Sequence, residues 1–161
     1  MQIELKNAKT GDVRLVNAEV DLASVLEKIN KPNMTNKDIF DFFENIELQA
    51  DLKALLKKII DVTVQIGNAT LHIGKKILEF IYFFVAKFPN TSTGIVVGSV
   101  LGMLISSIPV IGFILGWMIP PLCIALGLGI GFWHDMTNPV LAEGITKAIH
   151  DIFGGLSHVA A

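Results

Sequence analysis

The feature that most constrains this chain is a run of 46 residues without a charged side chain, from Phe88 to Trp133. One membrane-spanning helix needs about 20 apolar residues, so the run is long enough for two. The predicted reversal is Ser106-Ser107-Ile108-Pro109, because proline lacks an amide proton and disfavours helix in the residue before it. Pro120-Pro121 offers a second break. The alternative to a hairpin is one kinked helix to Ile119 followed by a short re-entrant segment.

The composition favours a membrane environment. Hydrophobic residues make up 52% of the chain and charged residues 17%, with a mean hydropathy of +0.57. Soluble domains carry about 25% charged residues. The net charge of −2 provides no basic surface for nucleic acid, and the single Cys123 excludes an intramolecular disulfide. We therefore expect a lipid bilayer as partner and no nucleic acid.

The charges beside the run predict an orientation. Lysines lie on its N-terminal side, whereas the connection from Ser106 to Gly112 carries no charge. This asymmetry predicts an inner-membrane protein with both termini in the cytoplasm. The aromatic segment 75–90 is too short for a span, so we expect it to lie at the membrane surface. The residues assigned to this interface are Lys75, Lys76, Tyr82, Lys87 and Trp133.

The flanking segments predict small amphipathic elements. Residues 1–20 alternate around a turn, as in a β-hairpin. Asp21 and the pair Thr35/Asp38 are predicted to cap two short helices. From Asp51 an apolar stripe that reaches Val64 favours one long amphipathic helix, with Gly67-Asn68 or Gly74 as places for a bend. Asn138-Pro139 is predicted to open a final amphipathic helix.

The predicted fold is a mainly α-helical integral membrane protein with a small N-terminal β-hairpin. A cytoplasmic region covers 1–74, and the interfacial helix covers 75–90. A transmembrane helical hairpin covers 91–133, and an amphipathic C-terminal helix covers 134–161.

Small residues recur through the uncharged run. Three glycines and a serine follow one another at every fourth position, which places them on one helix face and lets another backbone approach closely. Such faces serve equally for packing within one hairpin and between subunits. The candidate helix-packing or pore-lining residues are Gly94, Gly98, Gly102, Ser106, Gly112, Gly116, Gly127 and Gly131.

The sequence offers no catalytic group, cofactor site or metal site. The four histidines lack metal-ligand spacing with Asp, Glu or Cys, and Cys123 has no base near it in the run. We therefore expect a protein that is not an enzyme.

The favoured function is a homo-oligomeric pore or membrane-perturbing protein of the holin, toxin or antiviral-defence kind, assembled through the glycine faces. One alternative is a non-pore anchor whose N-terminal region holds a protein partner. Another is a soluble protein that converts to a membrane form. The layout of roughly residues 35–157 resembles that of the pore-forming bacteriocin domains of the colicin kind. It consists of amphipathic helices, an uncharged hairpin and a last helix. With only four or five amphipathic helices, we expect full burial of the hairpin in a monomer to be difficult.

Overall fold

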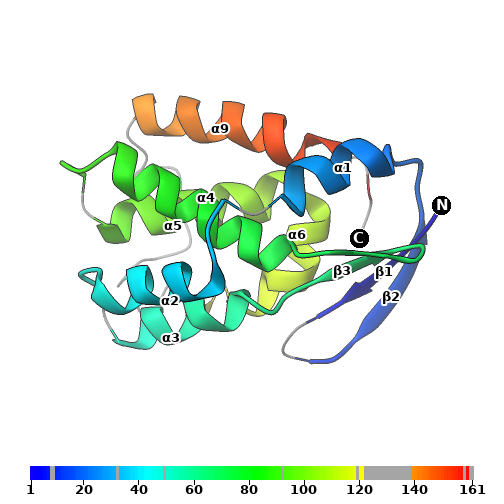
Figure 1. The fold of residues 1–161 in the computed structure, drawn as a ribbon, viewed down its shortest axis with the longest axis horizontal. Coiled ribbons are helices and arrows are strands. Elements are labelled where there is room, and N and C mark those ends of the chain that lie inside the picture. The colour runs from blue at the N-terminus through cyan, green and yellow to red at the C-terminus, as the bar shows by residue number, and fades with distance from the viewer. Residues whose placement is uncertain are drawn as a thin grey trace.

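The computed structural model describes residues 1–7, 10–31, 33–48, 50–91, 93–118, 120–121, 139–157 and 159. In Figure 1 the sheet occupies one end of the molecule and the helices pack together beside it. The strands are β1 (Gln2–Lys6), β2 (Val13–Asn17), β3 (Val64–Ile66) and β4 (Ala69–Leu71). The helices are α1 (Leu22–Ile29), α2 (Asn36–Asn45), α3 (Ala50–Ile59), α4 (Ile73–Lys87), α5 (Thr93–Ser107), α6 (Pro109–Leu115) and α9 (Pro139–Phe153), with short 3₁₀ turns η1 (Gly116–Met118) and η2 (Gly154–Leu156).

The four strands form one antiparallel sheet in the order β2-β1-β3-β4. Ile3 of β1 pairs with Val16 of β2 on one side and with Ile66 of β3 on the other. Alternate residues of β1 are buried, so Ile3 and Leu5 face the core while their neighbours face outward. The N-terminal hairpin expected from the sequence is thus present, and two further strands complete its sheet.

The long helix predicted from Asp51 past Val64 is wrong beyond Ile59. Helix α3 ends at Ile59, and the chain then forms the β3–β4 hairpin. Val62, Val64 and Ile66 alternate with more polar residues at the period of a strand, and all three are buried. Gly67 has a positive φ of 59°, a conformation that glycine adopts without steric cost. Pairing with β1, which is distant in sequence, stabilises this strand over a helix.

The predicted helix starts agree with the structure. The Asp21 carboxylate accepts a hydrogen bond from the Ser24 N–H at 3.3 Å and caps α1. Thr35 and Asp38 form the reciprocal capping box of α2. Both caps are hydrogen bonds between residues three positions apart, so the local sequence is sufficient to predict them.

The predicted fold class is also wrong, since the described residues form a mixed α/β fold with a four-stranded sheet. No helix among them is by itself long and apolar enough to cross a bilayer. Thr93–Ser107 and Pro109–Met118 satisfy the length and hydropathy of a span only when taken together, and they are bent by 116°. Hydropathy measures transfer out of water, and a protein interior accepts an apolar helix as lipid does.

Candidate functional site: a buried, uncharged helix pair

Helices α5 and α6 form an uncharged pair inside the fold. The middle of α5 is buried on every side, from Val96 through Leu101. Helix α5 packs against α4, α6 and α9, and α6 packs against β1 (Figure 1). The strands and amphipathic helices therefore jointly cover a pair that carries no charge of its own.

The two helices meet at a sharp break. Ile108 is extended, with φ −116° and ψ 107°, and Pro109 is the first residue of α6. A Cβ on Gly112 would lie 2.9 Å from the Ile105 carbonyl oxygen, so glycine permits α6 to fold back closely on α5. Ser106 and Ser107 are exposed at this break. The predicted reversal thus lies in the expected place, at an exposed end of the buried helix pair.

Few polar contacts hold the pair. The Asn7 side-chain amide donates to the Phe113 carbonyl oxygen at 3.3 Å, and the Arg14 guanidinium lies 4.9 Å from the centre of the Phe113 ring. Within the part of the chain that the structure describes, the buried Ser99 hydroxyl has no hydrogen-bond partner. Helix α5 is therefore held mainly by apolar packing, which is not directional.

Helix α4, which covers α5, is bound differently. Lys76 and Glu79 are each 6% exposed and form an ion pair at 3.0 Å. Sequence reasoning placed Lys76 at lipid headgroups, but here its stem and amine are buried. It did not identify Glu79, although opposite charges three residues apart in an apolar helix were an available signal.

The other predicted interface residues on α4 lie at or near the surface. Lys75 is partly buried, and Tyr82 packs edge-on against Phe42 with 4.7 Å between ring centres while remaining partly exposed. The Lys87 amine lies 5.6 Å from the centre of the Phe83 ring, and Phe83 is 53% exposed. The C-terminal half of α4 therefore presents aromatic rings beside a cation. Trp133 lies outside the described residues.

The predicted small-residue positions have different environments. Gly98 is buried, Gly94, Gly102 and Gly116 are partly buried, and Ser106 is exposed and donates to the Gly102 carbonyl oxygen at 2.9 Å. Of the set, Gly112 has a demonstrated close approach within this chain. Gly127 and Gly131 lie outside the described residues.

Metal chemistry finds no support in the described part of the chain, where no three His, Cys, Asp or Glu side chains gather in a way that could hold an ion. Comparison with family models gives no match, and neither do comparisons with curated proteins and with solved structures.

Proposed function

We propose that this protein is membrane-active, that the fold described above is its closed form, and that α5 and α6 enter a bilayer when their cover opens. The observation that carries the proposal is a buried helix pair without a charged side chain, covered by separate elements of the same chain. A helix that is apolar on every side is stable inside a protein or inside a membrane. The pair is thus suited to either environment.

The free energy of transfer is large enough for this exchange. The segment from Gly94 to Met118 contains 13 Leu, Ile, Val and Phe residues. At −0.3 to −0.6 kcal/mol each, they contribute about −4 to −8 kcal/mol to insertion, before penalties for glycine and proline. This is similar in size to the free energy of unfolding of a typical domain, about 5–15 kcal/mol. Insertion can therefore offset much of the cost of opening the fold.

The length of α5 limits how the pair inserts. At 1.5 Å per residue, its 15 residues extend about 22 Å, whereas the hydrocarbon core is about 30 Å thick. The pair therefore crosses by straightening at Ile108 or enters as a bent hairpin. In both arrangements Ser107, which is exposed in the closed form, moves into or through the hydrocarbon.

The C-terminal half of α4 is the surface proposed to meet the bilayer first. Phe83 and Tyr82 are exposed there, Lys87 adds a cation, and the chain continues directly toward α5. A Cβ on Gly144 would lie 3.5 Å from the Phe84 ring, so the first turns of α9, with Val140 at 67% exposed, lie close to the same half of α4. Aromatic rings with a nearby lysine are typical of membrane-surface contacts.

Assembly of several chains in the membrane is part of the proposal. Once α5 leaves its cover, the row Gly94, Gly98 and Gly102 becomes available to a second helix, and such rows allow close packing in lipid. The mass of the membrane-extracted particle, measured by light scattering with detergent subtraction, is expected to be a discrete multiple of 17.5 kDa. Gly98→Leu is expected to reduce it toward one chain.

The test of the function is release of a trapped dye from anionic lipid vesicles by the wild type and by Ser107→Arg. The serine is exposed, so the variant keeps the closed form. A charge inside the hydrocarbon costs about 2.5–3.5 kcal/mol, so release slows roughly 50-fold or more.

The matched control is Thr146→Arg, which places the same charge on an exposed position of α9 and leaves release unchanged. Equal release by both variants contradicts insertion of the pair. Absence of dye release by the wild type contradicts the proposed function as a whole.

A further inference from the structure

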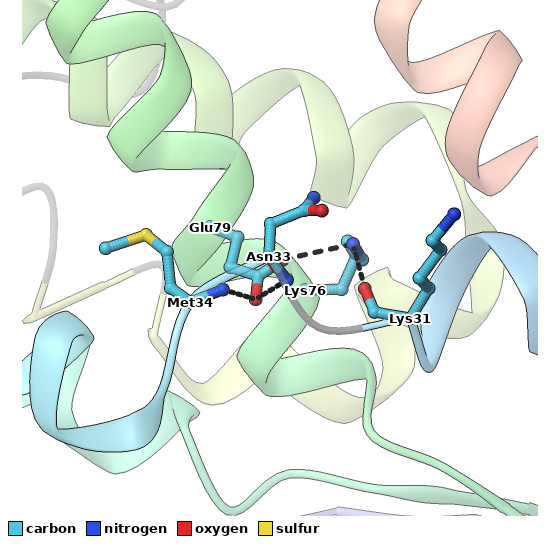
Figure 2. A network of polar contacts seen from close by, with 5 residues as sticks. All are labelled: Lys31, Asn33, Met34, Lys76 and Glu79. Carbon is cyan, nitrogen blue, oxygen red and sulfur yellow. Dashed lines mark hydrogen bonds and ion pairs between the residues drawn. The ribbon is translucent and has the colours of Figure 1, made fainter.

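Lys76 and Glu79 bind three backbone groups of the connection between α1 and α2, as Figure 2 shows. One oxygen of Glu79 accepts the N–H groups of Asn33 and Met34 at 3.1 and 3.2 Å, and the other accepts from the Lys76 amine at 3.0 Å. The Lys76 amine also donates to the Lys31 carbonyl oxygen at 3.0 Å. The ion pair on α4 therefore holds Lys31, Asn33 and Met34 of the α1–α2 connection in place.

The α1–α2 connection, which contains Lys31, Asn33 and Met34, joins two helices that pack on neighbours of α5. Helix α1, before it, packs on α9, and α2, after it, packs on α3 and α4. The connection thus joins a helix packed on α9 to a helix packed on α4, and both α9 and α4 contact α5. Its hydrogen bonds to Lys76 and Glu79 hold it against α4 (Figure 1).

Two pockets that are open to solvent border the ion pair. One of about 310 Å³ is lined by Asn30, Asn36 and His72 together with the ion pair. Another of about 330 Å³ is lined by Phe80, Ala148 and Asp151 together with the same pair. Met34 of the connection packs against the hydrophobic core, and the hydrogen bonds of Lys76 and Glu79 add directional contacts that hold the connection on α4.

We propose that Lys76 and Glu79 form an autoinhibitory clasp, which keeps the α1–α2 connection on α4 and thereby keeps the cover over α5 closed. This inference depends on the proposed function. A buried ion pair is suited to such a role because loss of either charge leaves the other buried without a partner, so the contacts are lost together. An exposed pair would separate with little consequence.

Two double variants test the clasp. In Lys76→Met/Glu79→Leu the helix stays apolar and folded, but the connection loses its three partners. Hydrogen exchange at the Asn33 and Met34 amides, measured without lipid, is expected to become about 100-fold faster or more. Dye release from vesicles is expected to become about 10-fold faster, because the closed form is less favoured.

The swapped variant Lys76→Glu/Glu79→Lys separates a clasp from an ordinary ion pair. It can keep opposite charges in contact, but a lysine at position 79 cannot accept the two N–H groups. A clasp therefore predicts fast exchange together with fast dye release in the swap, whereas a merely structural pair predicts fast exchange with wild-type release. Glu44→Gln, which removes the exposed pair with Lys57, is the control and leaves exchange at these two amides unchanged.

Each outcome decides the question. Wild-type exchange in both double variants, with normal dye release, overturns the clasp and leaves the proposed function intact. Faster exchange without faster release overturns the autoinhibitory role. Absence of dye release by the wild type and every variant overturns the proposed function and the clasp's autoinhibitory role together.

Discussion

Helices α4 and α5 have the same length of 15 residues, are both largely buried and pack against each other, yet they are held in different ways. Helix α4 carries a buried ion pair whose hydrogen bonds are made with particular backbone groups, so it fits one environment. Helix α5 carries no charge, and its buried Ser99 hydroxyl has no partner in the described part of the chain. Hydrogen bonds and ion pairs are directional and hold a helix such as α4 in one position. Apolar packing is not directional and requires only that a helix such as α5 be kept out of water.

Removal of one charge from α4 is expected to have the largest effect on stability. Lys76→Met leaves the Glu79 carboxylate buried without its cationic partner. Breaking a buried pair in this way costs about 3–5 kcal/mol of unfolding free energy, measured by urea denaturation. The double variant Lys76→Met/Glu79→Leu is expected to recover most of the loss. A loss below about 1 kcal/mol in the single variant would mean that α4 is held by packing alone, as α5 is.

A methyl group at the start of α4 tests the precision of its docking. A Cβ on Gly74 would lie 1.8 Å from the Ile59 carbonyl oxygen, so Gly74→Ala forces the α3 and α4 backbones apart. We expect a loss of about 2–3 kcal/mol in unfolding free energy.

Gly144→Ala on α9 is the matched control for this substitution. Its Cβ would make an ordinary 3.5 Å contact with the Phe84 ring, and alanine is the better helix former by about 1 kcal/mol. The control should therefore gain stability in the same urea experiment. Losses of equal size in the two variants would contradict the specific fit of α4 against α3.

Removal of the hydroxyl from α5 is expected to have a small effect of opposite sign. Ser99→Ala deletes a buried polar group without a partner in the described residues, and alanine favours helix. Unfolding free energy should rise by about 0.5–1 kcal/mol in thermal or urea denaturation. A loss greater than about 1 kcal/mol would show that α5 is positioned by a polar contact, and the contrast with α4 would weaken.

The smallest expected effect belongs to the exposed ion pair between α2 and α3. Glu44 and Lys57 have side chains 55% and 36% exposed. Glu44→Gln should change the unfolding free energy by no more than about 0.5 kcal/mol, because solvent screens such pairs. A change as large as that of Lys76→Met would show that an exposed ion pair stabilises the protein as much as a buried one. The effect of the ion pair on α4 would then not depend on its burial.

Features that depend on neighbouring residues in the sequence were predictable. The Asp21 cap, the Thr35/Asp38 capping box and the break before Pro109 each result from local sterics or hydrogen bonds. The pairing of β3 with β1 was not predictable in this way, because the two strands are far apart in the sequence. The same holds for the contacts of Glu79 with Asn33 and Met34.

The environment of the uncharged run could not be read from hydropathy. Counting amphipathic helices suggested too few to cover it, and that expectation omitted the sheet. Strand β1 packs on α6, and Ile3 and Leu5 on its inner face are fully buried. A strand with one apolar face covers a helix as well as another helix does. The described part of the run is therefore covered without lipid.

The most direct test of the central claim follows the position of Ser107 when the protein meets a membrane. A fluorescent nitrobenzoxadiazole probe is attached to Ser107→Cys in a Cys123→Ser background, and dithionite outside the vesicles reduces any probe that it reaches. Because Ser107 is exposed in the closed form, the probe is accessible before vesicles are added. The account predicts protection of the probe after addition, while a probe at Thr146→Cys on α9 stays accessible. Complete accessibility at position 107 in protein bound to vesicles would contradict it.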